Sequence, residues 1–82
     1  MTHDEEQQAQ FRAHLHMASY HNADDSGRER ALGIECQHRA ARVAAAAGWD
    51  DATVEQLFDE ARPLVAFNEL MRRVRQFRED AS

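Results

Sequence analysis

Residues that build strands and tight hairpins are scarce in this chain, and this scarcity limits its fold more than any other feature of the sequence. The 82 residues include only three glycines and one proline, and β-branched side chains are few. Alanine, glutamate, glutamine, arginine, leucine and methionine make up most of the rest, and all of them favour helices. We therefore predict an all-α fold, a small bundle of three to four helices in a single domain that spans residues 1–82.

The helical spacing of the apolar residues predicts four segments. Their approximate ranges are 5–21, 27–47, 52–62 and 64–79. Turn-forming residues separate the first two segments. Gly48 is expected to end the second helix in a left-handed conformation and to make a tight corner. Asp50, Asp51 or Thr53 would then cap the third helix.

Two apolar stripes follow this corner, one beginning at Val54 and one at Phe67. In one straight helix the second stripe would lie about 220° around the axis from the first. Both stripes can face one core only if the chain changes direction, so we predict a break or kink near Pro63, with Pro63 at or near the first turn of the fourth helix. The core should then include Leu57, Phe58 and Val74.

Charge and cysteine content narrow the class of protein. Cys36 is the only cysteine, which excludes an intramolecular disulfide and a cysteine-based zinc site. The N-terminus is acidic and polar, unlike a secretory signal, and no apolar run approaches the ~20 residues of a membrane span. We therefore expect a cytoplasmic protein with no membrane partner. The formal net charge of -5 disfavours nonspecific binding of nucleic acid.

The most specific local pattern surrounds Gly48. Ala44 lies four residues before this glycine, Trp49 follows it, and Val54 and Leu57 occupy the next predicted helix. The pattern resembles the helix-turn-helix of bacterial repressors, in which a small residue lets two helices cross closely and a glycine takes the turn. The resemblance covers less than a quarter of the chain, and it implies that the helix after Gly48 reads DNA.

The charges depart from that family, because the start of this helix carries carboxylates where a DNA reader faces phosphates. Only Gln56 suits contact with a base. The arginines that would hold a phosphate backbone lie on the fourth predicted helix instead: Arg72, Arg73, Arg75 and Arg78. A helix-turn-helix DNA-binding regulator is therefore our alternative hypothesis, and an ordinary structural corner explains the same pattern.

The histidines suggest a second alternative, a metal-binding helical bundle. His14, Met17 and His21 share an arc of the first helix, and Glu35 and His38 form an i, i+3 pair of the kind found in di-iron bundles. No second pair of this kind occurs, so a metal site would need a dimer and a further glutamate. Partly buried, hydrogen-bonded histidines explain the pattern without a metal, and we expect no cofactor.

The sequence offers little that suggests catalysis. It has no Gly-rich phosphate loop, nothing places a histidine beside Cys36, and a short helical chain has little volume for a substrate pocket. We therefore expect no enzymatic activity.

Our first hypothesis is a small regulatory or accessory protein that acts by binding another protein through helical surfaces. Its basic residues are all arginine and its alanine content is high, which is typical of a GC-rich bacterial genome or its phage. One candidate surface is acidic and would attract a basic patch, as an inhibitor that mimics a phosphate backbone does. It comprises Asp50, Asp51, Glu55 and Asp59.

The other candidate surface is a face of small residues on the second helix. It includes Ala31, Ile34, His38, Ala41 and Ala45. Left open, this face would be an apolar patch, and pairing around a twofold axis would remove it, so we expect a homodimer. The alternative is that the first helix folds back and covers the face within one chain, using Phe11 and Leu15.

Overall fold

The chain forms a small all-helical bundle in the computed structural model, which describes residues 3–22 and 27–81. Within these ranges the elements are α1 (His3–Asn22), α2 (Gly27–Ala47), α3 (Asp51–Ala61) and α4 (Phe67–Ala81), with no strand. The predicted all-α class and the division into four helices are confirmed. None of the helices in the described ranges is long and apolar enough to cross a membrane.

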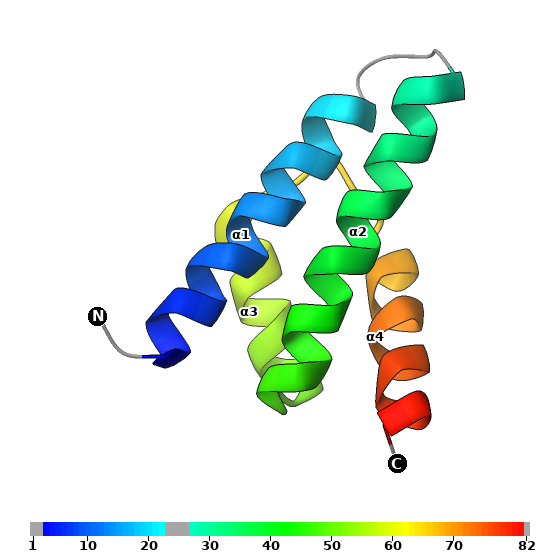
Figure 1. The fold of residues 1–82 in the computed structure, drawn as a ribbon. Helices are drawn as coiled ribbons and strands as arrows, with labels where there is room; N and C mark the ends of the chain where they lie inside the picture. Colours follow the sequence, from blue (N-terminus) through cyan, green and yellow to red (C-terminus); the bar gives the residue numbers. More distant parts are fainter. Residues whose placement is uncertain (1–2, 23–26, 82) are drawn as a thin grey trace.

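The helices pack as one antiparallel pair with two shorter helices against it (Figure 1). α1 and α2 form the most extensive contact, and α4 packs along α2, running in the same direction as its neighbour. α3 lies behind this pair and contacts α1 and α4. The arrangement places α4 against the side of α2 that α1 leaves open.

The corner between α2 and α3 forms where the sequence predicts it. Gly48 has a φ of 72°, the left-handed region that suits glycine, and its amide donates to the Ala45 carbonyl over 3.1 Å. Asp50 then caps α3, because its carboxylate accepts a hydrogen bond of 2.9 Å from the Thr53 amide. Gly48 and Asp50 therefore fix where α2 ends and α3 begins.

The break between α3 and α4 is confirmed, but the predicted position of Pro63 is wrong. α3 ends when Arg62 adopts a left-handed conformation, with a φ of 50°, and its amide donates to the Phe58 carbonyl. α4 begins only at Phe67, so Pro63 lies in the connection and not in the first turn of α4. The reason is a long-range contact: the Leu64 amide donates to the Ser19 hydroxyl over 2.7 Å, which holds the connection against α1 before α4 starts.

The core is built from small residues on α2 and larger ones on the other helices. Phe11 and Leu15 of α1 are fully buried and belong to the same cluster as three alanines of α2. Because alanine side chains are short, they let the α1 backbone approach α2 closely. The full cluster is Phe11, Leu15, Ala40, Ala41, Ala44, Trp49, Val54, Leu57, Ala61, Leu70, Met71 and Val74.

Both C-terminal stripes face this core, as the sequence predicts. Leu57 and Val74 are buried, and Phe58 is partly buried and packs against the cluster. The Phe58 ring also meets Phe67 edge to face, with ring centroids 5.1 Å apart. The left-handed residue Arg62 redirects the chain between the two helices, which brings both stripes to one side.

Truncating Leu57 to alanine should therefore lower the free energy of unfolding by about 2–4 kcal/mol, because the small domain cannot refill the cavity. Urea unfolding followed by circular dichroism measures the loss. Leu64→Ala is the matched control: this leucine is 70% exposed, so its truncation should change stability by no more than about 0.5 kcal/mol. A loss below about 1 kcal/mol for Leu57→Ala would contradict the packing of α3.

Candidate functional site

The predicted acidic surface and some of the predicted phosphate-binding arginines bind each other. Arg78 of α4 donates to the Asp51 carboxylate over 2.6 Å, and Arg75 lies 3.5 Å from the other oxygen of the same carboxylate. Arg78 also donates to the Trp49 backbone carbonyl over 2.6 Å. These arginines therefore fasten α4 to the corner, and their charge is compensated within the chain.

The same contacts at the corner lower the pKa values of Asp50 and Asp51. The hydrogen bond from Arg78 is the main reason why the pKa of Asp51 is lowered, and the hydrogen bonds from Thr53 lower the pKa of Asp50. Both carboxylates are therefore engaged within the chain: Asp50 caps α3, and Asp51 pairs with Arg78 of α4. Glu55 and Asp59 are exposed and have no hydrogen bond or ion pair with any described residue, so only these two members of the predicted acidic surface remain uncommitted.

The residues predicted to bind nucleic acid do not form one surface. Gln56 donates to Glu60 on its own helix over 3.4 Å, and Arg75 and Arg78 are held at Asp51. Arg72 and Arg73 lie elsewhere, on the side of α4 that faces α2. The helix that would read DNA thus carries carboxylates, and two of the four arginines are paired with a carboxylate of the chain itself.

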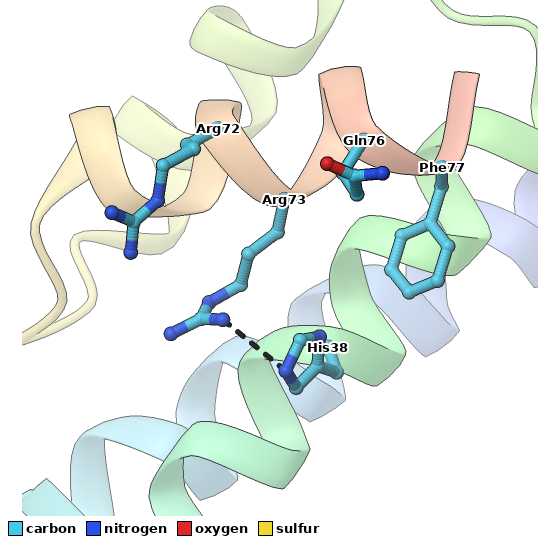
Figure 2. Close-up of a pocket in the computed structure, with 5 residues that line it drawn as sticks. All are labelled: His38, Arg72, Arg73, Gln76 and Phe77. Carbon is cyan, nitrogen blue, oxygen red and sulfur yellow. Dashed lines mark hydrogen bonds between the residues drawn. The ribbon is translucent and has the colours of Figure 1, made fainter. Parts of the chain in front are cut away.

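A groove between α2 and α4 holds the other two arginines (Figure 2). Its first part is a cavity of about 350 Å³, lined by His38, Arg72, Arg73, Gln76 and Phe77. Figure 2 shows Arg72 and Arg73 extending from α4 toward α2, where Arg73 reaches the His38 ring. Arg72 and Arg73 were predicted to bind phosphate, but no groove beside them was predicted.

Arg73 is fixed in this cavity by two side chains of α2. Its Nη1 lies 3.2 Å from His38 Nε2, and its Nε donates to Gln37 Oε1 over 3.5 Å. Partial burial, reinforced by the charges of Arg73 and Arg42, lowers the pKa of His38. Because a guanidinium can only donate, the neutral imidazole accepts through Nε2. The guanidinium of Arg73 is therefore held in place before any ligand arrives.

Phe77 divides this cavity from a second, apolar one. The second cavity, of about 160 Å³, is lined by Arg42, Ala45, Ala46, Phe77 and Ala81. The Arg42 guanidinium carbon lies 5.3 Å from the centre of the Phe77 ring, and the His38 ring meets the same ring edge to face at 6.1 Å. We call the two cavities together the α2/α4 groove. Phe77 is their common wall.

Positive charge in the groove is not compensated within the described chain. Arg42, Arg72 and Arg73 form no ion pair with any residue in the described ranges, and the residues that line the two cavities include no carboxylate. Asp80 lines neither cavity, but it accepts a hydrogen bond of 3.3 Å from the lining residue Gln76. A chain with a net charge of -5 thus has three arginines lining the two cavities that share Phe77, with no carboxylate among the lining residues.

The candidate metal ligands lie beside arginines. Glu35 accepts from Arg39 over 2.8 Å, and His38 contacts Arg73. Burial, followed by the charge of Arg39, lowers the pKa of His14. The side chain of His21 lies outside the described part of the structure. Among the described residues no group of three histidine, cysteine, aspartate or glutamate side chains is placed to hold a metal ion.

The predicted open face of α2 is partly closed, and Ala41 was wrongly assigned to it. Ala41 is fully buried in the core cluster, which contains Phe11 and Leu15 of α1 and also Leu70, Met71 and Val74 of α4, so this part of the face is closed within one chain. α1 folds back along α2 with Phe11 and Leu15 fully buried, but both α1 and α4 contribute to the cluster that contains Ala41. Ile34 remains 39% exposed, and Ala45 lines the apolar cavity beside Phe77.

Sequence reasoning did not find the α2/α4 groove. Phe77 belongs to the apolar stripe that begins at Phe67 and packs against the core, so its pattern does not mark it as a site residue, and Arg42 and Gln76 were not singled out. A signal was present: His38, Arg42, Ala45 and Ala46 recur at helical spacing on one side of α2. Nothing in the sequence says which helix lies opposite them, so the charged and aromatic residues of α4 could not be added to the set.

Comparisons with protein-family models, with curated proteins and with solved structures find no match for this chain. Its function is therefore argued from its own residues.

The Asp51 pair predicts how stability depends on pH. Because pairing depresses the pKa of Asp51, its stabilisation is fully present above the pKa of the unfolded chain and is lost as the pH falls through the depressed value. Asp51→Asn should therefore unfold at a lower urea concentration than the parent at pH 7, and the difference should shrink toward pH 2.

The matched control is Glu55→Gln, which removes one negative charge from the same helix without breaking an ion pair in the described chain. It should leave the urea midpoint nearly unchanged at both pH values. An Asp51→Asn variant as stable as the parent at pH 7 would show that the corner does not depend on this pair.

Proposed function

We propose that this protein is a small accessory or regulatory protein that acts by binding another protein, and that the α2/α4 groove is its binding surface. The observation that carries the proposal is the position of Phe77, which lines both cavities together with three arginines that have no ionic partner within the described chain, one of which, Arg42, lies over its ring. Aromatic and arginine side chains are the residues that most often dominate the energy of a protein interface.

The two surfaces named in the sequence analysis support binding less well than this groove. Asp50 and Asp51 serve the corner as a helix cap and as the partner of Arg78. Ala41 is fully buried in the core. A basic patch on a partner would therefore meet mainly Glu55 and Asp59, a small number of exposed charges that contribute little to affinity.

Binding also fits the chemistry of the chain better than catalysis. The lone thiol, Cys36, is buried, and burial raises its pKa, which keeps it protonated and weakly nucleophilic. His38 is engaged by an arginine that cannot accept a proton. Neither group is arranged as a nucleophile with its base.

The homodimer stays a prediction, and its basis has changed. Ala41 no longer supports it, but Leu32 and Ile34 on α2 are 37% and 39% exposed, and Met17 on α1 is 49% exposed. These side chains lie toward the end of the bundle where α1 stops and α2 starts, away from the Gly48 corner. Self-association there would leave the α2/α4 groove free for a different protein.

A photo-crosslinking amino acid tests the binding surface directly. Placed at position 76, inside the groove, it should form a defined adduct with a protein in the cells that make this chain. Placed at position 56, on the exposed side of α3, it should not. Phe77→Ala should abolish the adduct at position 76 while the circular dichroism spectrum stays helical.

Two results would contradict the proposal. Adducts with protein at position 56 and none at position 76 would show that the binding surface is the acidic side of α3 and not the α2/α4 groove. Adducts with nucleic acid at position 56 would instead support the helix-turn-helix alternative.

A further inference from the structure

The two ends of the α2/α4 groove have different chemistry. At one end, Arg72, Arg73, His38 and Gln76 line one cavity, in which the Arg73 guanidinium lies beside the His38 imidazole. At the other end the wall consists mainly of alanine methyl groups, with the Phe77 ring between the two ends. A ligand that fills both must combine a negative group with an apolar group and hold them a fixed distance apart.

The length of the groove favours a segment of a larger chain. His38 and Ala46 mark its limits on α2, and at 1.5 Å per residue they are about 12 Å apart along the helix axis. This length equals slightly more than two turns of a helix. A groove between two helices accepts a third helix by burying the apolar face of the incoming one.

The arginines determine the charge of this segment. Arg73 is already oriented by Gln37 and His38, and Arg72 has no ionic partner among the described residues. Planar guanidinium groups bind carboxylates through paired hydrogen bonds, and a guanidinium fixed in advance loses little conformational entropy on binding. The polar end of the groove is thus suited to a glutamate or aspartate side chain.

A nucleic acid fits these observations less well than a protein does. Its backbone would need positive charge along the whole groove, but Arg42 is the one charged residue that lines the second cavity, where its guanidinium lies over the Phe77 ring and the other lining residues are alanines. The carboxylate of Asp80, which is hydrogen-bonded to the lining residue Gln76, and the net charge of -5 would also repel a continuous phosphate chain. A peptide helix carries separate charges, so it can place carboxylates on the arginines and apolar side chains beside Phe77.

We infer, on the basis of the function proposed above, that the α2/α4 groove binds an acidic amphipathic helix of the partner protein. The carboxylates of this helix pair with Arg72 and Arg73. Its apolar side chains pack against Phe77, Ala45 and Ala46. The binding specificity of the protein lies in this combination of charge and apolar contact.

Titration of the ¹⁵N-labelled full chain with defined peptides tests the inference by NMR. The probe is a blocked peptide of about 14 residues with leucines on one helical face and glutamates beside them. It should shift the amide signals of His38, Arg42, Gln76 and Phe77. A matched peptide with glutamine in place of glutamate should bind at least about tenfold more weakly, because it lacks the charge-assisted hydrogen bonds.

Paired substitutions control for the charge of the protein. Arg72→Glu with Arg73→Glu should abolish the shifts, whereas Arg30→Glu with Arg62→Glu, which changes two exposed arginines that line neither cavity, should retain them. If the first pair loses the dispersed amide spectrum of a folded chain, Arg72→Gln alone replaces it and should weaken binding. Retained affinity in either groove variant would overturn the inference.

The remaining outcomes are equally decisive. Equal affinity for the glutamate and glutamine peptides, or shifts confined to α3, would overturn the inference. So would shifts in the groove caused by a short DNA duplex and not by the glutamate peptide. A protein adduct at position 76 combined with no response to the glutamate peptide would leave the proposed function standing and reject the acidic helix.

Discussion

Three consecutive residues, Trp49, Asp50 and Asp51, connect α1, α2, α3 and α4 at the Gly48 corner. The Trp49 ring meets Phe11 of α1 edge to face, with centroids 5.4 Å apart, and its amide donates to the last turn of α2. Asp50 caps α3, and Asp51 accepts from Arg78 of α4. An aromatic pair of this kind contributes about 0.5–1.5 kcal/mol beyond the area that it buries. In so thin a core, the position of each helix depends on these few contacts.

The same corner determines which charges reach the surface. Asp51 forms ion pairs with two arginines of α4, so the charges of Arg75 and Arg78 are compensated near the corner. Arg72 and Arg73 lie on a different side of the helix, where they face α2 and have no carboxylate opposite them. One helix thus uses two arginines to hold the fold together and presents two others in the α2/α4 groove. The function that we propose follows from this division.

Periodicity and special residues were sufficient to predict much of the fold. The stripes that begin at Val54 and Phe67 could not share a core in a straight helix, and this geometry alone required the break that the chain makes. Gly48 could be assigned because a left-handed corner favours glycine. The start of α4 was misplaced because the hydrogen bond from the Leu64 amide to Ser19 joins distant parts of the chain. Local sequence does not report such a contact.

The candidate site could be predicted only in part, since it depends on which helices are neighbours. The alanines of α2 offer similar small surfaces in several directions, so the sequence did not decide which face meets α1 and which meets α4. Ala41 was assigned to an open face for this reason. Arg72 and Arg73 were recognised as candidate ligand-binding residues from their charge. Their relation to Phe77 and His38 became visible only when the packing of α4 on α2 was known.

The dependence of the fold on the corner is tested most directly by unfolding the protein while two signals are recorded together. Trp49 is the only tryptophan, so its fluorescence reports the corner, and the far-ultraviolet circular dichroism reports the helices. If the corner holds α1, α2, α3 and α4 together, both signals should change in one transition with the same urea midpoint. Exposure of Trp49 at a clearly lower urea concentration, with the helices still folded, would contradict this account.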